Sequence, residues 1–205
     1  MKIICIIATV LFVFINANFA FAFKDKNFSI GLGYYSQNSL GYVSTKDNGK
    51  SSFLGPTFTP LNLRYDSNFS SDWFLSPQLS YTFIPRNLEG NTGKISFLHL
   101  ALQFGKNISD SGNLTWDIYG GPGLIRYDIK GAGGTTVMNN GTSTATFAVP
   151  GGTGVVQKLT TNLGTSMAFG KSIFSFDVII ENAFSNKKRT ESLMLSYAYI
   201  LGGGY

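Results

Sequence analysis

Large apolar side chains recur at every second position through most of this chain, and that spacing constrains the fold more than any other feature. In residues 98–104 they alternate with small or polar neighbours, and residues 75–83 and 193–201 repeat the pattern. Successive side chains of a β-strand point to opposite faces, so each segment has one apolar face and one small or polar face. A helix would space its apolar residues three and four apart, so these segments are predicted to be strands.

Eight such segments follow one another along the chain. They cover residues 27–37, 57–66, 72–84, 94–105, 113–129, 156–170, 172–183 and 192–202. Each has about the ten residues that a tilted strand needs to cross a bilayer, whereas strands of water-soluble proteins average about five or six. The sequence therefore predicts an all-β fold, an eight-stranded antiparallel up-and-down transmembrane β-barrel.

The predicted connections alternate between short and long. Short turns are expected at residues 67–71, 106–112 and 171, and longer loops at residues 38–56, 85–93, 130–155 and 184–191. Short turns on one rim and long loops on the other are typical of outer-membrane barrels. The longest loop, residues 130–155, is open to two interpretations: a mobile loop that binds a surface molecule, or a loop packed over the barrel mouth.

A soluble barrel would alternate in the same way, with its apolar face inward. Here the polar face consists mostly of Ser, Gly, Ala, Gln and Asn rather than the Lys and Glu of a water-exposed exterior, and such side chains fit the narrow lumen of a small barrel. Aromatic residues also fall at strand ends beside the short turns, where an interfacial girdle belongs. They are Tyr65, Trp73, Phe104, Trp116, Phe169 and Phe174. Both features favour the membrane barrel.

The first 22 residues have the features of a secretory signal peptide: Lys2, an apolar stretch over residues 3–14, and the sequence Ala20-Phe21-Ala22 as a cleavage site. An uncleaved membrane anchor is the alternative. The predicted division is thus a signal peptide at residues 1–22 and a barrel domain at residues 23–205. The only cysteine, Cys5, lies in the first part, so no disulfide is expected in the exported chain.

The stretch Tyr119 to Leu124 (Tyr-Gly-Gly-Pro-Gly-Leu), the eight amphipathic segments and the terminal Tyr205 resemble small Gram-negative outer-membrane barrels of the OmpA/OmpX type. The resemblance implies a place in the bacterial outer membrane with both termini in the periplasm, in contact with lipid and lipopolysaccharide. It also implies that the barrel-insertion machinery reads the terminal aromatic and the apolar residues at alternate positions before it. Leu201, Tyr199 and Tyr197 fit that signal, and Gly203 departs from it.

Five ionisable residues share the phase of the small lumen residues, and we expect them to form a polar network inside the barrel. They are Arg64, His99, Asp117, Asp177 and Glu181. Charges in a confined lumen need partners or trapped water, so Arg64 is expected to pair with one or more of these carboxylates and plug the barrel. A gated ion path is the alternative interpretation.

No catalytic residue, metal site or cofactor is expected. A lipid A deacylase needs a histidine and a serine together on the lipid-facing surface, but the lone histidine, His99, faces inward. With one His and no Cys after the signal peptide, only scattered carboxylates could act as metal ligands. The small excess of charge, +5, does not favour nucleic-acid binding.

The basic run Lys187, Lys188 and Arg189 lies in the last long loop. There it would stand at the height of lipopolysaccharide phosphates, so we expect a lipopolysaccharide contact, with a solvated loop tip as the alternative.

These features predict a monomeric, porin-like barrel of the cell envelope with a structural and surface-interaction role, whose surface-exposed loops make adhesive or envelope contacts. A narrow channel for small or hydrophobic solutes is the first alternative, and a lipid A-modifying enzyme is the second.

Overall fold

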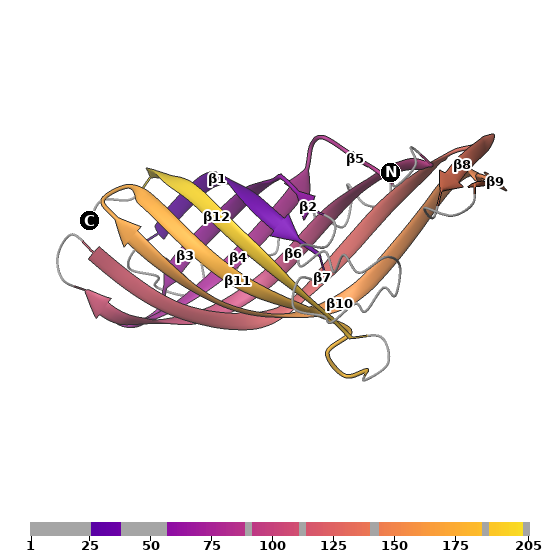
Figure 1. Cartoon of the computed structure of the whole chain (residues 1–205). Coiled ribbons are helices and arrows are strands. Elements are labelled where there is room, and N and C mark those ends of the chain that lie inside the picture. Colours follow the sequence, from indigo (N-terminus) through magenta and orange to yellow (C-terminus); the bar gives the residue numbers. More distant parts are fainter. Residues whose placement is uncertain are drawn as a thin grey trace.

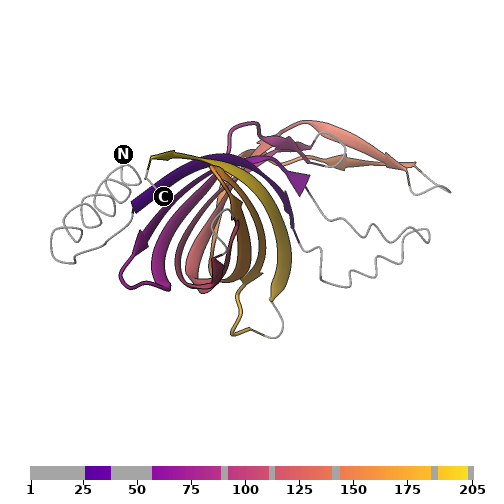
Figure 2. The ribbon, with the colours of Figure 1, turned by 90° about the vertical axis from the view of Figure 1, so that its left-hand side faces the viewer.

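The computed structural model describes residues 26–37, 57–88, 92–110, 114–139, 144–185 and 189–202. Eight long strands form one closed antiparallel sheet: β1 (Lys26–Ser36), β3 (Pro60–Asn68), β4 (Trp73–Thr82), β6 (Gly93–Asp110), β7 (Leu114–Ala132), β10 (Gly151–Phe169), β11 (Ser172–Glu181) and β12 (Thr190–Gly202). Each pairs with the next in sequence, and β12 pairs with β1 to close the barrel (Figure 1, Figure 2). The predicted fold class is confirmed. None of the described residues form a helix long and apolar enough to span a membrane.

Four short strands accompany the barrel. β2 (Thr57–Phe58) pairs with the end of β1, and β5 (Arg86–Asn87) pairs with the start of β6. β8 (Thr135–Asn139) and β9 (Thr144–Ala148) pair only with each other. β5, β8 and β9 belong to connections that were predicted to be long loops, so these connections are partly strand, whereas β2 lies in the predicted strand segment 57–66.

The strand register places the short connections and both chain ends of the barrel at one rim. Lys26 at the start of β1 lies opposite Ser67 near the end of β3, and Phe28 lies opposite Gly202 at the end of β12. The turns from β3 to β4 and from β10 to β11 lie at the same rim, which we call the turn rim. The opposite end, with β2, β5, β8 and β9, is the loop rim. The signal-peptide prediction and Tyr205 concern residues outside the described ones.

Residues 106–112 were predicted to be a turn, and for residues 106–110 that prediction is wrong; residues 111 and 112 lie outside the described ones. β6 continues to Asp110 and pairs with β7 throughout, with a register shift between Asn107 and Ser109. The N–H of Asn107 also donates to the carbonyl of Asp72 at 2.7 Å. Apart from Ile108 these residues are polar, but backbone pairing does not require apolar side chains.

The predicted loop at residues 130–155 is also corrected by the structure. β7 and β10 pair without interruption from Leu114 opposite Phe169 to Ala132 opposite Gly151. They form a ribbon that runs on past the end of β11 to β8 and β9 (Figure 1), and β6 stays paired with β7 along it as far as Gly93 opposite Gly131. Gly133 and Gly134, with φ of 71° and 82°, turn the chain from β7 into β8 in a region of φ that favours glycine.

The two faces of the barrel wall are as predicted. Asn162 is fully buried while its neighbour Leu163 is 54% exposed, so the polar face is inside and the apolar face is outside. A soluble barrel would show the reverse. Two apolar clusters also lie inside: Tyr35, Phe58, Phe97, Ile125, Tyr127, Ile179 and Met194 toward the loop rim, and Ala168, Ile173, Ala198 and Ile200 toward the turn rim.

Candidate functional site

Arg64 lies inside the barrel and joins several strands. Its Nε is 2.7 Å from Oδ1 of Asp66, two positions along the same strand. Its Nη1 donates to Oγ of Ser166 at 3.2 Å, and that hydroxyl donates to Oδ2 of Asp117 at 3.3 Å. The guanidinium therefore reaches Asp117 through a serine and ion-pairs with a carboxylate that the sequence analysis did not select. Asp66 could have been found, because residues two apart on a strand face the same side.

Two aromatic rings flank the Arg64 guanidinium. Its central carbon is 4.7 Å from the ring centre of Tyr119 and 5.6 Å from that of Phe74. A cation over a ring face is attracted by the ring quadrupole, and the attraction strengthens when water is excluded. The rings and carboxylates together compensate the buried charge.

Gly164 lies directly between Tyr119 and Asp177 in the register of β7, β10 and β11. A Cβ at position 164 would come within 2.3 Å of Cε2 of Tyr119 and 2.4 Å of Oδ1 of Asp177. Both side chains therefore lean into space that only a glycine leaves free. This brings Asp177 to the same level of the lumen as Arg64 and Tyr119.

Glu181 belongs to a separate group near the loop rim. Its carboxylate accepts hydrogen bonds from the hydroxyls of Tyr35 and Tyr127, and Nζ of Lys158 is 2.6 Å from Oε2. Lys158, Tyr35 and Tyr127 were not selected from the sequence, although Lys158 has the phase of the lumen residues that follow it on β10. The aromatic cluster around this group fills the lumen toward the loop rim.

His99 lies apart from both groups. It is 2% exposed, and its Nε2 is 3.1 Å from Oγ1 of Thr160. Nearby on the inner wall, Gln103 donates to Gln78 at 2.8 Å. The five predicted network residues thus all lie inside, but they divide between an Arg64 group, a Glu181 group and an isolated histidine.

Aromatic side chains ring the outside of the barrel near the turn rim. Phe104 packs between Phe69 and Trp73 at ring-centre distances of 5.3 and 5.2 Å, and Nζ of Lys106 is 5.6 Å from the Trp73 ring centre. On the same rim, Nε1 of Trp116 donates to Oγ1 of Thr165 at 2.6 Å. Aromatic rings with a polar end suit the membrane–water interface, so this band has the character of a girdle.

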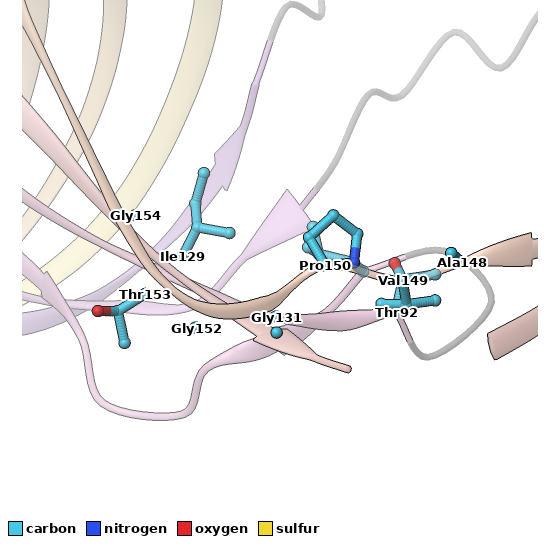
Figure 3. A pocket seen from close by; sticks show the side chains of 11 residues that line it. Thr92, Ile129, Gly131, Ala148, Val149, Pro150, Gly152, Thr153 and Gly154 are labelled. Carbon is cyan, nitrogen blue, oxygen red and sulfur yellow. The ribbon is translucent and has the colours of Figure 1, made fainter. Parts of the chain in front are cut away.

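The ribbon of β7 and β10 has two unusual features. No Asp, Glu, Lys or Arg occurs between Lys130 and Lys158. Moreover, β11 pairs with β10 only from Thr160 onward, so residues 151–158 have no strand partner on their second edge among the described residues. An open groove on this ribbon is lined by Leu88, Ile129, Val149 and Pro150 and by the glycines of β10 (Figure 3).

Of the predicted lipopolysaccharide contact, Lys187 and Lys188 lie outside the described residues. Arg189 is described, and its Nε is 2.9 Å from Oε1 of Glu191 in an exposed pair. In the described part of the chain, no group of three or more His, Cys, Asp or Glu is placed to hold a metal ion.

No family model and no curated protein matches this sequence. Among solved structures, the chain is similar to Ail, the attachment invasion locus protein of Yersinia pestis, in complex with the heparin analogue sucrose octasulfate. The two sequences are 15% identical, the match covers 86% of this chain and 98% of that one, and the TM-score is 0.50. It is also similar to Neisserial surface protein A (7% identity, 84% and 94% covered, TM-score 0.47) and to the N-terminal β-barrel domain of Pseudomonas aeruginosa OprF (9%, 85% and 97%, 0.43). At these identities the similarity concerns the fold alone. The chain has the architecture of the small eight-stranded outer-membrane barrels.

Proposed function

We propose that this protein is an integral outer-membrane barrel that holds the β7–β10 ribbon and its other loops outside the cell for contact with surface molecules. The observation that carries the proposal is the ribbon itself, which extends past β11 with no charged residue between Lys130 and Lys158. Among the residues that the structure describes, residues 151–158 also have no strand partner on the second edge of β10. Soluble proteins protect such edges with charges, prolines or covering segments. An edge left open in this way is suited to pairing with an extended segment of another molecule.

The outer surface supports the membrane location. Its exposed apolar side chains end at the aromatic band of the turn rim, as in transmembrane barrels. Periplasmic turns of such barrels are short and extracellular loops long, so the turn rim with both termini belongs in the periplasm. Recognition by the barrel-insertion machinery and lipopolysaccharide contact at Lys187, Lys188 and Arg189 remain part of this proposal.

The channel alternative has less support from the lumen. A solute would have to pass the Tyr35 and Phe97 cluster near the loop rim and then the Arg64 group, and an eight-stranded barrel leaves little room beyond its own side chains. The lipid A-modifying enzyme has less support still, because His99 is buried inside the barrel rather than placed on the lipid-facing surface.

The contact role can be tested in cells that display the protein. Replacing residues 133–150 by an Asn-Gly turn removes β8 and β9, and Val156→Lys places a charge on the open edge of β10. Both changes should lower adherence to host-cell monolayers and survival in serum. Ser71→Lys adds the same charge at the turn rim and should leave both unchanged. Wild-type adherence and serum survival in both altered strains would overturn the proposal.

A further inference from the structure

Two lysines lie directly opposite each other just above the barrel wall. Lys94 of β6 is in register with Lys130 of β7. On either side the row continues with Asn87 of β5, opposite Lys94, and Thr153 of β10, opposite Lys130. All four side chains are exposed. Directly opposed residues of antiparallel strands point to the same face, so two ammonium groups, an amide and a hydroxyl line one side of the sheet.

That side is the outer, lipid-facing one. On β6, Lys94 has the phase of the outward Leu98, whereas Phe97 and His99 are buried inside. On β7, Lys130 has the phase of the outward Leu124, whereas Ile125 and Tyr127 are buried. Figure 3 shows Thr153 and Ile129 on opposite sides of the ribbon, which agrees with this phase.

The row also stands at the height of lipid headgroups. Lys106 lies beside the girdle residue Trp73 at the turn rim, and Lys94 is on the same strand beyond the apolar residues Phe104 to Leu98. Between the two lysines the strand rises roughly 40 Å, or roughly 30 Å along the membrane normal at a tilt of ~40°. This matches the hydrocarbon thickness of about 30 Å, so Lys94 and Lys130 emerge at the opposite interface.

Like charges placed directly opposite on a sheet repel each other. On the same face, Asp128 precedes Lys130 by two residues, but Arg126 engages its carboxylate through both Nε and Nη2, the shortest contact being 2.6 Å. No ion pair to a carboxylate is formed by Lys94 or Lys130 among the described residues. A bound anion would convert this repulsion into two charge-assisted hydrogen bonds.

An apolar groove runs down the barrel wall just below the row. Its walls include Leu61, Tyr81, Phe83 and Leu98, and its lining is completed by Arg126 and Asp128, which precede Lys130 by four and two residues. A ligand with a phosphate above and an acyl chain below would contact the lysines with its phosphate and fill the groove with its acyl chain. A soluble anion would occupy only the lysines.

We propose that Asn87, Lys94, Lys130 and Thr153 bind the phosphate of an outer-leaflet phosphoglycolipid whose acyl chain lies in the groove below. The site lies on paired strands just above the barrel wall and uses no residue of β8 or β9. Its test measures lipid retention rather than adherence, so it is independent of the contact role proposed above. A phosphate bound there would hold the base of the β8–β9 hairpin at the membrane surface, because Lys130 lies two residues before the end of β7.

The test uses the full-length barrel in phosphatidylcholine nanodiscs that contain lipid A, with bound lipid A counted by native mass spectrometry after release. The Lys94→Gln/Lys130→Gln double variant should retain about tenfold less lipid A than the wild type, the loss expected for two charge-assisted hydrogen bonds partly screened by water. The Lys106→Gln/Lys171→Gln variant loses the same charge at the turn rim and should retain the wild-type amount.

Two further arms identify the ligand. Lipid A stripped of its phosphates should bind the wild type as weakly as intact lipid A binds the double variant. Inorganic phosphate at millimolar concentration should not displace lipid A. Equal retention by the double variant, equal binding of the stripped lipid, or displacement by inorganic phosphate would each overturn the lipid site.

Discussion

The guanidinium of Arg64 lies over the ring of Tyr119, 4.7 Å from its centre, although β3 and β7 are not neighbours in the sheet. The contact crosses the lumen and ties two distant parts of the wall together. Because the charge is buried, its contribution to stability depends on the partners around it.

Removal of Arg64 should therefore destabilise the barrel. Arg64→Ala leaves Asp66 without its ion pair and removes the hydrogen bond that links Arg64 to Asp117 through Ser166. An uncompensated buried charge typically lowers the free energy of unfolding by about 3 to 5 kcal/mol. Arg64→Lys should recover part of this loss, because it keeps the positive charge but not the planar guanidinium and its several N–H donors. Urea unfolding from lipid vesicles, followed by gel mobility, measures the free energy of unfolding.

The matched control is Arg189→Ala, which breaks the exposed pair with Glu191 and should change the free energy of unfolding by less than about 1 kcal/mol. Equal stabilities of the Arg64→Ala and Arg189→Ala proteins would show that the lumen group does not stabilise the fold.

Gly164 should not tolerate a side chain. Gly164→Ala places a methyl group against Tyr119 and Asp177, and overpacking of this kind costs about 1 to 3 kcal/mol. Gly154→Ala, where a Cβ meets nothing within 4 Å, is the control for the substitution itself. The same unfolding assay compares the two variants. A Gly164→Ala barrel as stable as the Gly154→Ala barrel would contradict the close packing of Tyr119 and Asp177 against position 164.

The wild-type lumen should not conduct steadily in planar bilayers. Tyr35 and Phe97, with ring centres 4.8 Å apart, fill it near the loop rim, so a Tyr35→Ala/Phe97→Ala variant should show currents that the wild type lacks. Steady wild-type currents that vanish in Arg64→Ala or Asp117→Asn would instead favour the channel.

Both tryptophans of the chain, Trp73 and Trp116, belong to the turn-rim girdle. Their fluorescence should be quenched more by lipids brominated near the headgroup than by lipids brominated deep in the acyl chain, because indole rings with a polar end settle at the interface. The variants Trp73→Phe and Trp116→Phe report each position separately. Absence of quenching by any brominated lipid would place these residues outside the bilayer.

Much of the wall could be predicted because alternation is a local property. The inward phase of Asn162 and the outward phase of Leu163 follow from their spacing alone, since successive strand residues must face opposite sides. The strand limits were harder to predict. At Lys106 to Asp110 and along the ribbon the side chains no longer alternate in hydropathy, while backbone hydrogen bonds continue the strands.

The sequence by itself determined the barrel, its apolar exterior and the inward position of Arg64, His99, Asp117, Asp177 and Glu181, because each depends on period and length within one strand. Only the tertiary structure decided that Arg64 lies against Tyr119, that Lys158 pairs with Glu181, and that Lys94 lies opposite Lys130. Those relationships depend on which strands are neighbours and in what register, and register is a property of two strands together.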